Sequence, residues 1–414
     1  MLSIRDPIHG FIRADPLEAA LIASRPVQRL RFIHQLGLTF LVFPGAEHSR
    51  FSHALGAMHL AGRVYDALRG RGDGALSLLP AGAAARERRL VRVAALLHDL
   101  GHAPFSHSTE ELFEGGIDHE EMTRRLIAAP EIAGIFARHG GGLTTADVVR
   151  LLKGGGSPGE RLLAQIVSGE LDVDKMDYLL RDSLFCGVRY GSYDLDRLLD
   201  TLLAIEDPAS GEQGIGLEEG GVHAVEALVM ARYYMFTQVY FNVTGKALEL
   251  HLNAWLIEEG TRWAAEPESF LAQDDVSIWT AMRRSPSLHA RAVTERLHFP
   301  LAFETREHLR PDDKERFEAL IPELARRFGE GNLLISNSAK DPHRLRSSRV
   351  LVRRYDGALE PMTDASQFIR HLARIDRYRV YTPQALRSEV GAALRELWTA
   401  PATESSPSFK ALDI

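Results

Sequence analysis

The sequence predicts a mainly α-helical protein, with an all-helical core and a smaller α+β unit towards its C-terminal end. Three observations favour this fold class. From Pro16 to about Leu203, apolar residues recur at helical spacing and glycine-rich loops interrupt them. After about Glu266, short apolar and β-branched runs alternate with helical segments. The chain of 414 residues is also longer than one compact core usually holds.

The helical core is expected to occupy residues 1–265. Its predicted helices lie at 16–23, 26–36, 50–69, 83–102, 119–128, 145–153, 160–168, 172–183 and 194–203. The glycine-rich segment 204–221 is typical of a small β-hairpin. A long helix is expected to follow it over about 222–262.

The α+β unit is expected to occupy residues 266–400. Its predicted elements are strands within 296–303, 332–336, 349–355 and 379–381, and helices over 312–328 and 384–397. Residues 401–414 begin with a stretch rich in Pro, Ser and Thr, so they are expected to form a disordered tail.

Bulk composition excludes several classes of protein. The net charge of −7 and the aromatic content of 8% disfavour a general nucleic-acid binder, and the charge also disfavours a membrane-surface binder. The single cysteine, Cys186, excludes an intramolecular disulfide framework and a cysteine-based zinc finger. The N-terminus has no apolar signal region, and no run approaches the ~18 apolar residues of a spanning helix. We therefore expect a cytoplasmic protein.

The segment Val91–His107, VRVAALLHDLGHAPFSH, carries the strongest chemical signal. His98 and His102 lie one turn apart on a helix whose other faces are apolar, and Asp99 lies beside them. A buried carboxylate is costly unless it is paired or binds a metal, and imidazole and carboxylate are common ligands of divalent transition metals. The alternative is that the histidines bond backbone carbonyls and Asp99 caps the helix end.

A metal site would need ligands from elsewhere in the chain. His53 lies on the small-residue stripe of another predicted buried helix. Asp174 lies next to a helical face formed by Lys175, Tyr178 and Asp182. A solvated charged face is the alternative interpretation of that second cluster.

Six segments, in this order, resemble the HD-domain superfamily. More narrowly, they resemble the deoxynucleoside triphosphate (dNTP) triphosphohydrolases related to the sterile-alpha-motif and HD-domain protein of animals. The segments are DPIHGFI (6–12), QRLRFIHQLG (28–37), VFPGAEHSRFSHALG (42–56), HDLGHAPFSH (98–107), HE (119–120) and LDVDKMDYLLRD (171–182). An ordered series of this kind is far more specific than a lone His-Asp pair.

The resemblance implies a metal held by His53, His98, Asp99 and Asp174. It does not fix the ion, which could be Mn, Fe, Zn, Ni or Co, with a second Mg²⁺ possible beside the substrate. The implied substrate-binding residues are Gln35, Leu36, Val42, Arg50, Lys175, Tyr178, Asp182, Arg232 and Tyr240. Among these, Arg50 and Lys175 would contact the phosphates, and Tyr178 would pack against the 2′ carbon of the sugar.

The implied reaction is hydrolysis of a dNTP to a deoxynucleoside and inorganic triphosphate. His107 is the expected proton donor to the departing 5′ oxygen, and His102, Glu110 and His119 are expected to position or deprotonate water. Other reactions of the superfamily stay open, namely those of a 5′-nucleotidase, a cyclic-nucleotide phosphodiesterase or a guanosine tetraphosphate hydrolase. A nucleotide-binding regulator without catalysis also stays open.

The family resemblance implies a homo-oligomer, either a dimer or a tetramer. The chain departs from the animal protein in three places. Asn242 and Val243 replace a His and a Lys, and the segment 23–26 lacks the acidic residue that recognises guanine in an allosteric site. Cys186 has no partner for redox control. Activation and redox regulation as in animals are therefore not expected.

Overall fold

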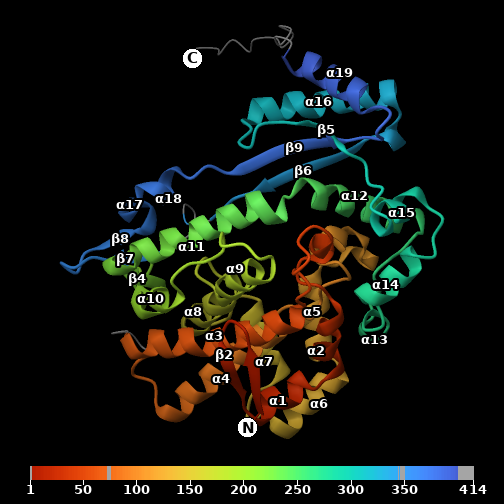
Figure 1. The fold of residues 1–414 in the computed structure, drawn as a ribbon. Coiled ribbons are helices and arrows are strands. Elements are labelled where there is room, and N and C mark those ends of the chain that lie inside the picture. The colour runs from red at the N-terminus through yellow and green to blue at the C-terminus, as the bar shows by residue number, and fades with distance from the viewer. Residues whose placement is uncertain (1, 72–75, 344, 346–349, 400–414) are drawn as a thin grey trace, which may run out of the picture.

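The structure is a computed structural model that describes residues 2–71, 76–343, 345 and 350–399. It is mainly helical, with a smaller α+β region, as the sequence predicts. In Figure 1, strands β9 and β6 lie above the helical core, and helices α16 and α19 lie on the other side of these strands. The predicted disordered tail, 401–414, lies outside the described residues.

The helices follow one another along the chain in two parts. The first part contains α1 (Pro16–Ile22), α2 (Arg25–Arg29), α3 (Arg50–Arg71), α4 (Ala81–Leu97), α5 (His119–Ala128), α6 (Pro130–His139), α7 (Thr145–Leu152), α8 (Pro158–Val167), α9 (Val173–Phe185) and α10 (Leu195–Thr201). The second part contains α11 (Val222–Met235), α12 (Val243–Glu258), α13 (Pro267–Phe270), α14 (Asp275–Met282), α15 (Leu288–Thr294), α16 (Pro311–Phe328), α17 (Met362–Ala365), α18 (Gln367–His371) and α19 (Arg387–Thr399).

The strands form three sheets. The first is the antiparallel hairpin of β1 (Leu2–Asp6) and β2 (Gly10–Ala14). The second has the order β3-β4-β7-β8, with β3 (Leu202–Glu206), β4 (Gln213–Glu218), β7 (Leu351–Arg353) and β8 (Leu359–Pro361). The third has the order β5-β9-β6, with β5 (Leu301–Glu304), β9 (Ile375–Tyr381) and β6 (Leu334–Lys340).

Helix α3 lies at the centre of the helical core and packs against α4, α8 and α9. Small residues make these close approaches possible: Ala54, Ala57 and Ala61 are fully buried. A Cβ atom at Gly56 would lie 1.9 Å from Oδ1 of Asp177, so only glycine lets α9 approach α3 at this point. The small buried residues of α3 therefore set the distance between α3, which carries His53, and α9, which carries Asp174.

A second apolar cluster holds the C-terminal helices on the third sheet. Phe317 and Leu324 of α16, Val380 of β9 and Leu394 of α19 are all fully buried in it.

The predicted division of the chain into two units at residue 265 stays a prediction. Strands on both sides of that division share one sheet, because β4 pairs with β7 in parallel.

Four local expectations were wrong. The helix expected over 26–36 ends as an α-helix at Arg29 and continues only as a 3₁₀ turn to Phe32. The N-terminal residues form the β1–β2 hairpin, whose turn begins where Oδ1 of Asp6 accepts hydrogen bonds from the backbone N–H groups of Ile8 and His9. The helix expected over 83–102 ends at Leu97, before the glycine at 101. The long helix expected over 222–262 is interrupted by a π-helical turn at Phe236–Tyr240, and α12 restarts where Asn242 caps it.

Helix α6 and the short helices α13, α14 and α15 were not predicted either. In the described residues, none of the helices combines the length and the apolar character needed to cross a membrane.

Candidate active site

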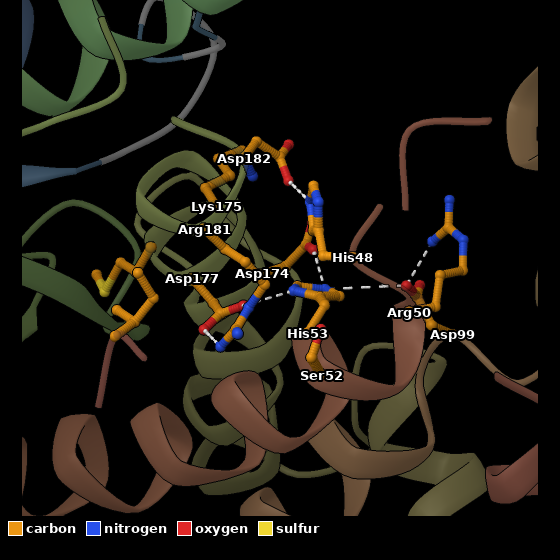
Figure 2. A network of polar contacts seen from close by, with 12 residues as sticks. His48, Arg50, Ser52, His53, Asp99, Asp174, Lys175, Asp177, Arg181 and Asp182 are labelled. Atoms are coloured by element: carbon orange, nitrogen blue, oxygen red, sulfur yellow. Dashed lines mark hydrogen bonds and ion pairs between the residues drawn. The ribbon is translucent and has the colours of Figure 1, made fainter. Parts of the chain in front are cut away.

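Four of the predicted side chains converge at the ends of three helices, and Figure 2 shows three of them, His53, Asp99 and Asp174. His53 lies in α3, His98 and Asp99 follow the end of α4, and Asp174 lies in the first turn of α9. Nε2 of His53 is 3.0 Å from Oδ1 of Asp174 and 3.8 Å from Oδ2 of Asp99. Nε2 of His98 is 3.2 Å from Oδ1 of Asp99 and 3.6 Å from Oδ1 of Asp174.

Both histidines are oriented through their other ring nitrogen. Nδ1 of His53 donates to Oδ2 of Asp177 at 2.8 Å, and Nδ1 of His98 donates to the carbonyl oxygen of Ala95 at 2.8 Å. These bonds leave the Nε2 lone pairs of both rings facing the carboxylates of Asp99 and Asp174. Metal-binding histidines usually have an outer partner of this kind.

The donor set fits a divalent metal. Ligands that lie ~2.1 Å from one ion are ~3.0–3.5 Å from their neighbours, which is close to the spacing of these atoms. Nε2 of His53 and Nε2 of His98 are buried and make no hydrogen bond of good geometry, although carboxylate oxygens lie near them. Two lone pairs and two carboxylates that face one point form a site for a cation.

Ionised carboxylates surround the two histidines. Burial lowers the pKa of His53, but the carboxylates of Asp174 and Asp177 outweigh burial and raise this pKa to about 10. Burial raises the pKa of Asp99, but His98, Arg50 and His102 outweigh it and hold this pKa well below its usual range. The carboxylates therefore stay ionised and attract either protons or a metal ion to the histidines.

Local sequence explains how these residues are presented. Asp172 caps α9 by accepting the backbone N–H of Lys175 at 2.8 Å, which fixes Asp174 in the first turn. Asp118 caps α5 in the same way and places His119 at its first position. A Cβ atom at Gly101 would lie 2.0 Å from the carbonyl oxygen of His119, so glycine at 101 lets α5 approach the turn that follows His98 and Asp99.

A guanidinium group lies directly behind the candidate metal site. Nη1 of Arg50 donates to Oδ2 of Asp99 at 2.5 Å, and its Nε donates to Oγ of Ser106 at 2.9 Å. Arg50 is buried and lines the same cavity as His98, Asp99 and Asp174. The hydrogen bonds to Asp99 and Ser106 therefore fix the orientation of the Arg50 guanidinium before any substrate binds.

A second cluster lies beside Asp99. Nε2 of His102 is 3.2 Å from Oδ1 of Asp99, and the ring of His102 stacks on that of His119 with centroids 4.4 Å apart. Nδ1 of His119 lies 2.8 Å from Oε1 of Glu110. Burial lowers the pKa of His119, but Glu110 outweighs burial and raises it. The side chain of His107 lies outside the described residues.

One cavity of about 410 Å³ is lined by three of the candidate metal ligands, His98, Asp99 and Asp174, and by most of the predicted substrate residues. Its lining includes Gln35, Leu36, Arg50, His98, Asp99, His102, His119, Asp174, Lys175, Tyr178, Asp182, Arg232 and Tyr240. Val42 is not among the lining residues in the described part of the chain and packs against the core instead.

The far end of the cavity is lined by aromatic and carboxylate groups. The hydroxyl of Tyr240 donates to Oδ2 of Asp182 at 2.8 Å, and the rings of Tyr178 and Tyr240 meet edge to face at 6.4 Å. The π-helical turn after α11 brings Tyr240 to this position. A side chain that a regular helix would have placed elsewhere therefore contacts a residue of α9.

Two further cations line the cavity. Nζ of Lys175 donates to the carbonyl oxygen of Gly169 at 2.7 Å and to Oδ2 of Asp172 at 2.5 Å. Nη1 of Arg232 donates to the carbonyl oxygen of Pro342 at 2.9 Å. Both residues also line an adjoining cavity of about 680 Å³.

Sequence reasoning missed three residues that support the site. Nε2 of His48 is hydrogen-bonded to Oδ1 of Asp182 at 2.8 Å, and Asp177 accepts a hydrogen bond from Nδ1 of His53. Asp275 accepts the backbone N–H groups of His34 and Phe105, which lie in two separate loops of the site. His48 and Asp177 lie inside segments that carry the family resemblance, which was the available signal. Nothing in the sequence around Asp275 points to the site.

The likenesses to known proteins agree with this geometry. The HD domain matches residues 50–182, and the HD associated region matches residues 193–406. A hypothetical protein from Aquifex aeolicus has a crystal structure that superposes with a TM-score of 0.80 at 30% identity, covering 95% of this chain and 99% of that one. A phosphohydrolase from Bacteroides thetaiotaomicron superposes with a TM-score of 0.72 at 26% identity, covering 92% and 99%.

Among curated sequences, the deoxynucleoside triphosphate triphosphohydrolase SAMHD1 homolog of Dictyostelium discoideum is 33% identical over 259 residues. That match covers 59% of this chain and 47% of the relative. Two other curated relatives are matched over 59% and 58% of their lengths, so the chain spans about half to three fifths of such relatives.

The chain belongs to the HD-domain family and carries the HD associated region over more than half of its length. The HD domain, the phosphohydrolase neighbour and the His/Asp cluster together support a metal-dependent phosphohydrolase.

Proposed function

We propose that this protein hydrolyses dNTPs to deoxynucleosides and inorganic triphosphate. The observation that carries the proposal is the single cavity that His98, Asp99 and Asp174 share with Arg50, Lys175, Tyr178 and Asp182. Binding a phosphate chain requires positively charged side chains near the metal ligands to neutralise its charge. Binding a sugar requires an apolar surface against its ring and hydrogen-bonding groups beside that surface. The cavity offers both in one place. The likeness to the Dictyostelium triphosphohydrolase supports the same substrate class.

His53, His98, Asp99 and Asp174 are proposed to hold a divalent metal, which when bound would supply Lewis-acid activation of water and of a phosphate oxygen. In the proposed reaction, water attacks the α-phosphorus and the bond from that phosphorus to the 5′ oxygen breaks. Arg50 and Lys175 stabilise the negative charge that grows on the phosphate oxygens. Arg50 suits this task because Asp99 and Ser106 already orient its guanidinium.

Proton transfers fall to the histidines in this proposal. His107 donates a proton to the departing 5′ oxygen, the role expected from its place in the family segment 98–107. His119 and Glu110 form a pair 2.8 Å apart beside His102, and they orient the attacking water. The sugar lies against Tyr178, with Asp182 held between His48 and Tyr240 as its polar partner.

The test is chromatography of the products formed from a panel of dNTPs and NTPs with Mn²⁺, Mg²⁺ or Co²⁺. The expected products are deoxynucleoside and inorganic triphosphate. His98→Ala serves as the control, because it removes a proposed metal ligand and should abolish turnover. Release of pyrophosphate or of single phosphates would contradict the proposal.

A further inference from the structure

Asp275 holds two separate loops of the candidate site with one carboxylate. It is the first residue of α14 and is only 3% exposed. Its Oδ1 accepts the backbone N–H of Phe105 at 2.8 Å. Its Oδ2 accepts both the backbone N–H and the Nδ1–H of His34, each at 2.8 Å. Asp275 belongs to the HD associated region, whereas Phe105 belongs to the HD domain.

The two loops lead directly to residues that line the cavity. Next to His34, the backbone N–H of Gln35 donates to the carbonyl oxygen of His48 at 3.0 Å. Next to Phe105, Oγ of Ser106 accepts from Nε of Arg50 and lies 3.2 Å from the carbonyl oxygen of His34. Asp275 therefore lies one contact behind both Gln35 and Arg50.

The turn at Phe105 and Ser106 needs support from outside. Both residues have left-handed backbone conformations, with φ of 58° and 62°, which are unfavourable for residues other than glycine. Such a turn persists only where its surroundings hold it, and the bond from Phe105 to Asp275 is a direct tie.

The segment before Asp275 supports the rest of the same loop. Nε1 of Trp263 donates to the carbonyl oxygen of Thr109 at 2.7 Å. Arg29 donates to the carbonyl oxygens of Gln273 at 2.9 Å and His102 at 3.0 Å. The segment 263–275 is thus fastened along the loop that carries His102 and Glu110.

We propose that Asp275 is a positioning residue through which the HD associated region fixes Arg50 and Gln35 for substrate binding. The proposal rests on the proposed function for the identity of the substrate, but not for the contacts that Asp275 makes. It assigns to a residue outside the HD domain an effect, transmitted through two loops, on how the candidate site binds phosphate and sugar.

Asp275→Asn is a sharp variant because it keeps the size and shape of the side chain. An amide has one oxygen and one NH₂ group, and the backbone N–H groups of Phe105 and His34 face opposite oxygens of the carboxylate. Whichever way the amide turns, its NH₂ group meets an N–H donor. One loop therefore loses its tie and faces an additional donor.

Asp274→Asn is the matched control. Asp274 precedes Asp275, is partly exposed, and caps α14 by accepting the backbone N–H of Ser277 at 2.8 Å. Asparagine caps helices about as well as aspartate, so this variant should keep α14 and leave the two loops unchanged.

The first measurement is hydrogen–deuterium exchange of the Mn²⁺-loaded full chain, read by mass spectrometry. In Asp275→Asn, the peptide that covers the loop facing the new NH₂ group, either 33–37 or 103–109, should exchange about tenfold faster or more, because that loop loses a hydrogen bond worth about that factor. Peptides from β6 and β9 should exchange as in wild type, and the bound Mn²⁺ should stay at the wild-type level. A general loss of stability would instead speed exchange throughout the chain.

The second measurement is steady-state kinetics with a dNTP and with bis(p-nitrophenyl) phosphate. The KM for the dNTP should rise about tenfold in Asp275→Asn, because Arg50 and Gln35 contribute to binding, and kcat should fall as well, because Arg50 also stabilises the charge that grows on the phosphate. Asp274→Asn should match wild type in both measurements.

The outcomes separate this inference from the proposed function. Wild-type exchange in both loops of Asp275→Asn, or an unchanged KM, would overturn the positioning role. If wild type cleaves the bis ester but no dNTP, the proposed substrate is wrong, and loop exchange together with the KM for the bis ester still decides the role of Asp275. If wild type cleaves neither compound, loop exchange alone decides it.

Discussion

Nδ1 of His53 donates to Oδ2 of Asp177 at 2.8 Å, and both side chains are fully buried. Asp177 is itself held by Arg181, whose Nε and Nη2 donate to it at 2.8 and 2.9 Å, and by Nε2 of His9 at 2.6 Å. Arg181 in turn donates to Asp6 of the N-terminal hairpin at 2.9 Å. A chain of buried polar contacts therefore runs from the hairpin to a proposed metal ligand (Figure 2 shows its inner part).

Asp177→Asn should weaken metal binding by about 10–100-fold, because the amide no longer fixes the tautomer and orientation of His53. Isothermal titration with Mn²⁺ measures this. Asp6→Asn is the matched control, since it breaks the same network at Arg181 without touching His53. Both variants should lose stability, on the order of 3 kcal/mol, as a buried charge loses a partner. Equal metal affinities in the two variants would contradict the positioning of His53 by Asp177.

Metal binding should stabilise the fold. At a free Mn²⁺ concentration of about 100 times the Kd, the free energy of unfolding should rise by ~2.7 kcal/mol, because the ion binds only the folded state. Urea unfolding with Mn²⁺ and with a chelator measures the difference. His98→Ala should lose the gain, whereas His223→Ala should keep it, because the side chain of His223 is 93% exposed and lies in α11. A gain that survives His98→Ala would place the ion elsewhere.

Sugar selectivity should depend on Tyr178. A ribose 2′-hydroxyl pressed against its ring would lose water without gaining an acceptor, which costs about 1–3 kcal/mol. dNTPs should therefore be favoured over NTPs by at least about tenfold in kcat/KM, since ~1.4 kcal/mol corresponds to tenfold.

Two variants separate the sugar from the phosphates. Tyr178→Ala should narrow the ratio of dNTP to NTP turnover. Lys175→Ala should lower turnover of both, because both carry the same phosphates. Parallel assays of dATP and ATP measure the ratio, and equal turnover by wild type would remove the main support for deoxynucleotide specificity.

Stability should fall in mild acid because His251 is buried in its neutral form. Burial, followed by the neighbouring His289 and His298, lowers the pKa of His251 from 6.5 to about 3. Below pH 6.5 the unfolded chain takes up a proton that the folded chain does not, so stability is lost as the pH falls from 6.5 towards 3. The expected slope is about 1.4 kcal/mol per pH unit for this group.

Denaturant unfolding measured from about pH 7 to about pH 5 checks this slope, because the ordinary pKa of histidine lies between these two values. His251→Gln should lower the slope by about 1.4 kcal/mol per pH unit relative to wild type, because glutamine does not titrate. Its amide oxygen replaces Nε2 as the acceptor for the backbone N–H of Phe299, so the fold is kept. His223→Gln, at an exposed position, should leave the slope unchanged. A slope that persists in His251→Gln would assign the effect to other groups.

The sequence by itself determined the fold class and indicated a His/Asp cluster of the kind that can hold a metal. Helical periodicity is a local property, so the helices that carry His53 and Asp174 could be predicted within a few residues of their bounds. The adjacency of His98 and Asp99 in an apolar segment already indicated a buried pair that needs compensation. The ordered family segments then identified partners far away in sequence.

Tertiary structure decided the contacts between those segments. The turn that places Tyr240 against Asp182 depends on a π-helical interruption, and helical periodicity does not distinguish that interruption from a continuous helix. The hold of Asp177 on His53 depends on the absent side chain at Gly56, where the two helices meet. Asp275 reaches the site through hydrogen bonds to loops at His34 and Phe105, and no local sequence pattern records a contact between segments so far apart in the chain.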